Sequence, residues 1–240
     1  MNRITSPIPE NLLSLWKEQD NLLDWSQQVV SKDVCLQDHL ELVEAYMSTV
    51  DSVRRCAPLG NRHFALCGLF MRTFDSLAQC ARFALTGNYS GSAIYARDLL
   101  ETLFLIDYLM EDIDRPEAWL ASDNKTRREK FNPGVVRDAL DKRDGYKEGK
   151  RLAHYKILSE MGAHPTPASF SLKKDGAQQL RTGPFRQVNL LEACLQEAAI
   201  MTSELARILL RYCRSEIADS AQITSRLSVL QQRTVEKYFP

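Results

Sequence analysis

The stretch SAIYARDLLETLFLIDYLM, residues 92–110, decides the fold of this protein. As a helix it would be apolar on nearly every side, whereas a helix at a protein surface confines its apolar residues to one stripe. We therefore expect this segment to be the central helix of a bundle, starting at Ser90 or Ser92. The apolar surroundings predict that four of its side chains are buried: Leu99, Leu100, Leu103 and Phe104.

On both sides of this segment, apolar residues recur at intervals of three and four, which is typical of amphipathic helices. Helices are expected at about residues 12–30, 36–57, 62–86, 188–214 and 222–238. Pro58 and Gly60 break the chain between two of them. Gly87 is placed to cap the helix that precedes the central one.

The part of the chain after Pro116 is more polar and predicts shorter helices, at about residues 117–131, 135–140 and 148–161. We expect Gly162 to end the last of these. Residues 163–185 contain three prolines and the turn signal Lys174-Asp175-Gly176, which favours a long loop or a small β-hairpin. Strands are expected only there.

These patterns together predict an all-α protein, an antiparallel multi-helix bundle whose short connections make neighbouring helices antiparallel. A length of 240 residues with 44% hydrophobic and 26% charged residues is typical of a globular protein. One helical domain over residues 1–240 is expected, in which residues 1–60 can form an N-terminal helical hairpin extension. Two small domains are the alternative.

The sequence has neither a signal-peptide pattern at its start nor an uncharged apolar run long enough to span a membrane. We therefore expect a cytoplasmic protein without a membrane partner. Its six cysteines are scattered and never form a CxxC pair, so we interpret most of them as core residues. No phosphate-binding loop, dinucleotide fingerprint, HExxH or GxSxG occurs, and no cofactor is predicted.

Basic residues are concentrated in the middle of the chain. Between Arg115 and Arg186 there are sixteen lysines and arginines against nine aspartates and glutamates, although the whole chain has zero formal charge. An excess of this size is common on solvated surfaces, so it only permits an anionic partner.

Two sets of polar residues stand out against this apolar background. Arg97 and Glu101 lie four residues apart in the central segment, with Asp107 further on. They either form a structural network, with each other or with Arg72, Asp75 or Arg82 of the preceding helix, or contact a ligand.

The second set lies in HYKILSEMGAHP, residues 154–165. Tyr155 and Ser159 share a helix face, and Gly162 turns the chain so that His164 follows. His164 either caps the helix end or joins the polar groups of the central helix in one site. A metal bound by Glu101, Asp107, His154 and His164 would have suitable ligand types but no supporting spacing, so no metal site is predicted.

The motifs GNYSGSAIYARDLLETLFLIDYL (87–109) and YKILSEMGAHP (155–165) resemble an uncharacterised bacterial family of all-helical proteins, distantly similar to the HEPN superfamily and to abortive-infection proteins. The resemblance covers roughly residues 64–170. It implies that the site comprises Arg97, Glu101, Tyr155, Ser159 and His164. The arginine-to-histidine spacing of four to six residues that HEPN ribonucleases share is missing here.

The leading hypothesis is a helical binding module in a bacterial stress or defence setting that recognises an anionic ligand, RNA or a nucleotide. The first alternative is a metal-independent ribonuclease of HEPN-like type, in which His164 acts as general acid or base, Arg97 stabilises phosphate charge and Glu101 completes the site. The second is a non-catalytic structural protein that forms a homodimer through an apolar face.

Overall fold

The computed structural model describes residues 7–147 and 149–238 and is all-α, with 79% of residues helical and 1% in strand. Glu148, where one of the expected helices begins, lies outside the described residues, as do residues 1–6. The α-helices within the described part are α1 (Glu10–Val30), α2 (Val34–Cys56), α3 (Asn61–Leu85), α4 (Tyr89–Leu109), α5 (Arg115–Leu120), α6 (Asn124–Lys130), α7 (Pro133–Arg143), α8 (Lys150–Leu158), α9 (Val188–Glu216) and α10 (Ser220–Tyr238).

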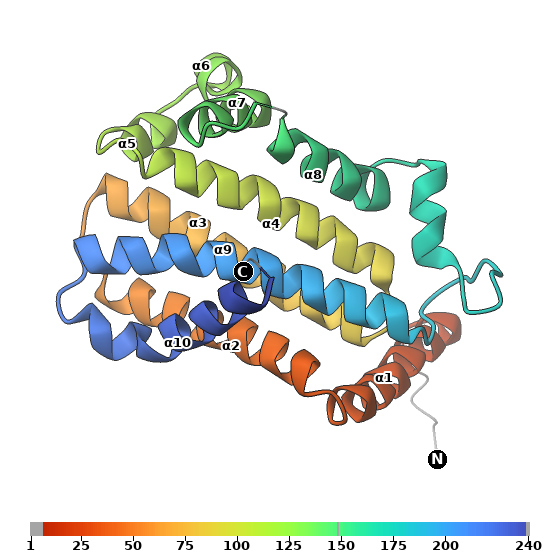
Figure 1. Ribbon diagram of the computed structural model, residues 1–240. Coiled ribbons are helices and arrows are strands. Elements are labelled where there is room, and N and C mark those ends of the chain that lie inside the picture. Colours follow the sequence, from red (N-terminus) through yellow and green to blue (C-terminus); the bar gives the residue numbers. More distant parts are fainter. Residues whose placement is uncertain (1–6, 148, 239–240) are drawn as a thin grey trace.

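Helix α4 is the central helix of the bundle, as its apolar sequence predicts. It packs against α3 and α9 on one side and against α5, α7 and α8 on the other. Figure 1 shows the resulting layers: α5–α8 cover α4 at the top of the view, and α2 and α10 lie below α3 and α9. The long helices run alongside one another in a bundle.

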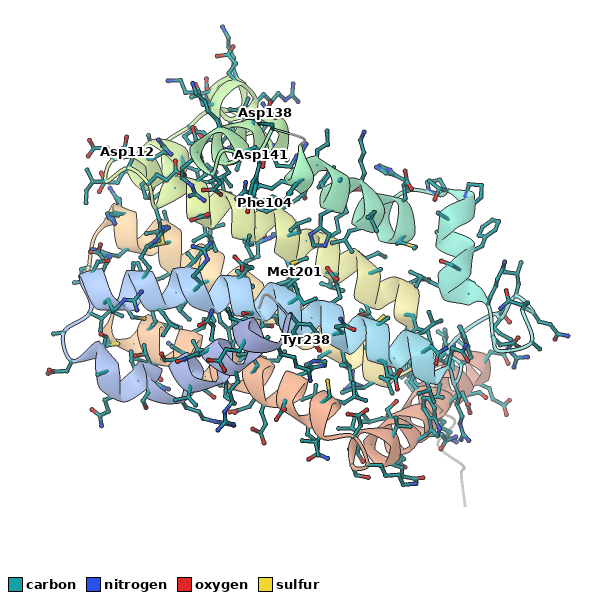
Figure 2. The ribbon with its side chains drawn as sticks, viewed as in Figure 1. Phe104, Asp112, Asp138, Asp141, Met201 and Tyr238 are labelled. Carbon is teal, nitrogen blue, oxygen red and sulfur yellow. The ribbon has the colours of Figure 1, made fainter. Side chains whose placement is uncertain are left out.

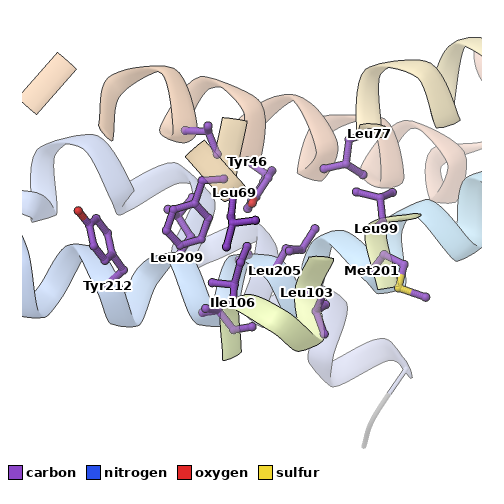
Figure 3. Packing of buried hydrophobic residues seen from close by; sticks show 14 of the residues in the cluster. Tyr46, Leu69, Leu77, Leu99, Leu103, Ile106, Met201, Leu205, Leu209 and Tyr212 are labelled. Carbon is purple, nitrogen blue, oxygen red and sulfur yellow. The ribbon is translucent and has the colours of Figure 1, made fainter. Parts of the chain in front are cut away.

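The main core joins α2, α3, α4, α9 and α10. Tyr46 of α2, Phe70 of α3 and Leu205 of α9 are completely buried in it, and side chains from α2, α3, α4 and α9 meet in Figure 3. All four core residues predicted in α4 are buried: Leu99, Leu100, Leu103 and Phe104. Because α2 contributes to this core, residues 34–56 are an integral part of the bundle.

The helix boundaries differ from the expected ones where side chains cap the helix ends. Asn88, rather than a serine, caps α4, because its side chain accepts a hydrogen bond from the Gly91 N–H at 3.1 Å. The expected helix over residues 117–131 is two helices, α5 and α6. Asp123 separates them by accepting the Thr126 N–H at 2.7 Å, as an N-cap residue does.

Within the described residues, strand-like pairing occurs in the stretch over residues 163–185, where strands were expected. It consists of a single antiparallel bridge between Lys174 and Leu180. A 3₁₀-helix over Pro167–Lys173 precedes it. The far end of this loop is anchored at the turn between α3 and α4. Gly87 has a φ of 73° there, and a Cβ on it would lie 2.7 Å from the Phe185 carbonyl oxygen, so only glycine fits.

Helix α1 packs on the periphery of the bundle. Leu22 is buried, but Leu12 and Trp16, which belong to the same apolar stripe, each remain 45% exposed. None of the helices in the described residues combines the length and apolar character needed to cross a bilayer.

Candidate ligand-binding site

Arg97 is the centre of a hydrogen-bonded network between α4 and α8. Its Nη2 donates to Glu101 Oε1 at 3.0 Å, one turn further along α4, and to the Tyr155 hydroxyl at 2.7 Å. Its Nε donates to Ser159 Oγ at 3.0 Å. Hydrogen bonds therefore join four of the five predicted site residues, and the charges of Arg97 and Glu101 pair with each other.

Close backbone packing at Gly162 brings Ser159 to this network. Residues Ser159–Ala163 form a π-helix that continues α8, so Gly162 does not end a helix as expected. A Cβ on Gly162 would lie 2.7 Å from the Ile94 nitrogen and 2.8 Å from the Ala93 carbonyl carbon. Only glycine lets the two backbones approach this closely, and such π-helical turns are frequent at functional sites.

His164 is not joined to the Arg97 network. The His164 side chain is exposed. This side chain forms no hydrogen bond or ion pair with another residue in the described part of the chain. The cap at this helix end is formed by the main chain, whose His164 N–H donates to the Ser159 carbonyl at 2.8 Å.

Arg137 of α7 also lies beside the Arg97 network, although it was not predicted from the sequence as a site residue. Its guanidinium carbon lies 4.2 Å from the centre of the Tyr155 ring, and that of Arg97 lies 5.1 Å from it. Arg137 Nη1 is buried and has no hydrogen-bond partner among the residues described. The sequence had no signal for this, because Arg137 belongs to a short polar helix on which arginine usually faces solvent.

A cavity of about 550 Å³ lies between α3, α4, α5 and α7, next to Glu101. Its lining is mostly apolar and aromatic, with Phe64, Leu69, Phe104, Leu105, Trp119 and Phe131 among its residues. Phe104 lies on the side of α4 that faces α7 (Figure 2). Small-molecule sites are typically apolar cavities of 300 to about 1,000 Å³ with a few polar groups.

The polar residues of the cavity differ in how far their hydrogen-bonding capacity is used. Asp98 accepts from Arg72 on one oxygen and from Ser76 Oγ, at 2.7 Å, on the other. Thr102 donates to the carbonyl of Asp98 at 2.9 Å. Glu101 uses Oε1 for Arg97, and no described side chain donates to its second oxygen. Glu101 is therefore the free acceptor in the wall of the cavity.

Gly68, in the middle of α3, keeps the cavity open. A Cβ built on it meets no heavy atom within 4 Å, so packing does not demand glycine there. Glycine inside a helix costs roughly 0.5 to 1 kcal/mol relative to alanine. An isolated glycine inside a helical pattern is the signal by which this position, though not the cavity beside it, could have been found in the sequence.

Asp107 and His154, the other residues considered as metal ligands, belong to two separate polar contacts. Asp107 is buried and contacts Arg143 at 2.8 Å and Arg211 at 2.9 Å, while His154 pairs with Glu197 at 2.9 Å. Burial raises the pKa of Asp107, but the hydrogen bond and charge of Arg143 and the charges of Arg207 and Arg211 outweigh it and lower the pKa overall. The described residues contain no group of three or more side chains arranged to hold a metal ion.

No protein family model, curated protein or solved structure matches this chain. The resemblance to HEPN-like proteins therefore remains an expectation from its motifs, and the site has to be interpreted from its own geometry.

Proposed function

We propose that this protein is a helical binding module whose ligand is a small, flat molecule held in the mostly apolar cavity between α3, α4, α5 and α7. The observation that supports this proposal is the free carboxylate oxygen of Glu101 in the wall of a mostly apolar cavity. The Glu101 side chain is 27% exposed, and a carboxylate in mostly apolar surroundings forms strong hydrogen bonds with ligand groups that donate to it.

The lining favours a flat ring with N–H donors as the ligand. Phe104, Trp119 and Phe131 offer aromatic surfaces for stacking, and an ionised carboxylate accepts N–H groups strongly. A nucleobase combines both properties, which agrees with the nucleotide among the ligands predicted from the sequence. In this proposal the base, rather than a phosphate, occupies the cavity.

The Arg97 network has a supporting role in this proposal. Arg97 holds one oxygen of Glu101, and Tyr155 and Ser159 hold Arg97, so the free oxygen keeps its direction. Such support from surrounding side chains keeps a binding group in its productive geometry. Tyr155 and Ser159 then act as positioning residues.

A second candidate, binding of an anion beside Arg97, is favoured by Arg137. This arginine adds a positive charge next to Arg97, and its buried Nη1 lacks a partner among the described residues. RNA or a phosphate group would supply the missing acceptor. A ribonuclease has less support, because His164 and Arg97 are not joined, and the stress or defence setting remains a prediction from the resemblance.

Calorimetric titration of the full-length protein with guanosine, adenosine and their 5′-monophosphates tests the first proposal. Gly68→Leu should fill the cavity and weaken nucleoside binding at least about tenfold, which corresponds to about 1.4 kcal/mol. Glu101→Gln removes the charged acceptor and should weaken binding about 10- to 100-fold. The control is Glu204→Gln, at an exposed carboxylate of α9, which should bind as the wild type does.

The outcomes separate the two candidates. If no nucleoside binds, or if Gly68→Leu binds as tightly as the wild type, the cavity proposal is wrong. If only the monophosphates bind and Arg137→Gln abolishes this binding, the anion candidate replaces it.

A further inference from the structure

A second cluster of reactive side chains lies where the end of α10 packs on the start of α2. Cys35 is the second residue of α2, and His39 follows one turn later. Lys237 Nζ donates to Cys35 Sγ at 2.7 Å, and the Tyr238 hydroxyl lies 3.7 Å from the same sulfur. His39 Nε2 lies 3.5 Å from Cys35 Sγ and 2.6 Å from the Tyr238 hydroxyl. Figure 2 labels Tyr238 at the end of the last helix.

His39 is an unusual residue for a purely structural contact. It is only 4% exposed, and its Nδ1 is buried without a hydrogen-bond partner among the residues described. Burial, followed by the charge of Lys237, lowers the pKa of His39, although Asp38 and Asp33 raise it. The ring is therefore neutral near pH 7 and has one nitrogen able to accept a proton.

The surroundings of Cys35 are those of a nucleophile. The deprotonated sulfur is the attacking species of a cysteine, and cationic neighbours and a helix N-terminus favour it. Here the Lys237 ammonium contacts the sulfur directly. The Asp33 carboxylate accepts the Cys35 N–H at 2.8 Å, so it caps the main chain of α2 instead of contacting the sulfur. Cys35 is half-buried, which leaves part of its surface open to a small reagent.

The other cysteines lack these neighbours. Burial raises the pKa of Cys80 and Cys213 to about 12 and that of Cys194 to about 11, and burial also raises the pKa of Cys67. Cys56 is exposed, and its thiol donates to the Ser52 carbonyl at 3.0 Å. Cys35 is therefore the described cysteine with both a lysine and a histidine at its sulfur.

We propose that Cys35 is a nucleophilic thiol and the site at which this protein forms a mixed disulfide with low-molecular-weight disulfides. Cys35 gives its proton to His39 Nε2 or to water and attacks one sulfur of the disulfide. The old S–S bond breaks as the new one forms, and the other half leaves as a thiolate that takes up a proton. One disulfide and one thiol are consumed, and one disulfide and one thiol result.

The test measures the reaction of the full-length protein with oxidised glutathione at pH 7.5. Peptide mass mapping over time gives separate rate constants for Cys35 and Cys56 in the same molecules. Cys35 should react at least about tenfold faster than Cys56, although Cys56 is more exposed. Cys35→Ser should lose this fast adduct and keep the slow one.

Lys237→Gln and Lys32→Gln form a matched pair, because each change removes one positive charge from an exposed lysine. Lys237 lies at the end of α10, and Lys32 lies just before the start of α2. Lys237→Gln should slow the reaction of Cys35 at least about fivefold, whereas Lys32→Gln should change it less than about twofold. A Cys35 rate no higher than that of Cys56, or a rate that Lys237→Gln leaves unchanged, would overturn the proposal.

Discussion

The guanidinium of Arg97 donates a hydrogen bond of 2.7 Å to the hydroxyl of Tyr155, 58 residues later in the chain. This contact connects the central helix to α8, and the same guanidinium also holds Glu101 and Ser159. Glu101, Tyr155 and Ser159 therefore accept hydrogen bonds from one planar guanidinium. Its N–H donors point in fixed directions, whereas the ammonium of lysine has no such planar arrangement.

Arg97→Lys should therefore lower the free energy of unfolding by about 1 to 3 kcal/mol, because at least one of the three acceptors loses its donor. Urea denaturation followed by circular dichroism measures this change. Arg72→Lys is the control: Arg72 pairs with Asp98 but is 58% exposed, so this change should cost less than about 1 kcal/mol. Equal losses in the two variants would contradict a special role of Arg97 in the fold.

Leu103→Ala should lower the free energy of unfolding by about 2 to 5 kcal/mol, through lost burial and the cavity that remains in the core. Leu103 is 5% exposed in the middle of α4. The comparison is Val229→Ala on α10, where the side chain is 53% exposed and the change should stay within about 0.5 kcal/mol. An unchanged denaturation midpoint of Leu103→Ala would refute the central position of α4.

Two glycines should respond to alanine in opposite directions. Gly162→Ala places a Cβ against the backbone of Ala93 and Ile94 and should cost about 1 to 3 kcal/mol, since neither backbone can yield easily. Gly68→Ala meets open space and should raise stability by about 0.5 to 1 kcal/mol through better helix propensity. Thermal melting of both variants beside the wild type measures the two signs, and a stabilising Gly162→Ala would contradict the close approach of the π-helix to α4.

Asp107→Asn should lower stability at pH 7 by about 1 to 3 kcal/mol, because it replaces the buried carboxylate that accepts from Arg143 and Arg211 with a neutral amide. The folded protein holds the pKa of Asp107 below its usual value, so the carboxylate stabilises the fold above roughly pH 4. This stabilisation is lost as the pH falls through the lowered pKa.

The difference between wild type and Asp107→Asn should consequently shrink from pH 7 to pH 3 in urea denaturation. Asp20→Asn, at an exposed position of α1, should behave like the wild type at both pH values. A difference that stays constant over this range would mean that the charge of Asp107 is not what stabilises the fold.

The fold could be predicted from the sequence because helix formation depends on local periodicity, and α4 is apolar on all sides. The pairing of Arg97 with Glu101 followed from their spacing of four. The cavity could not be predicted, since its lining comes from separate helices whose packing is set by contacts distant in the sequence.

The interpretation of most cysteines as core residues holds for Cys80 and Cys213 but not for Cys56, which is exposed, or for Cys35, which is half-buried. Its neighbours Lys237 and Tyr238 are about 200 positions away in the chain. No local pattern can report such an encounter, and the same holds for Arg137 beside Tyr155.

The segment between α8 and α9 is held at both ends, by Gly162 against Ala93 and by Phe185 against Gly87. Between these anchors, the turn from Lys174 to Leu180 is closed by main-chain hydrogen bonds of its own. Chain added at the turn between Lys174 and Leu180 would leave both anchors in place. Lengthening a loop costs only about 0.6 kcal/mol for each doubling of its length. This turn is therefore a permissive position at which a peptide epitope or a fluorescent reporter can be inserted without displacing the helices that form the cavity.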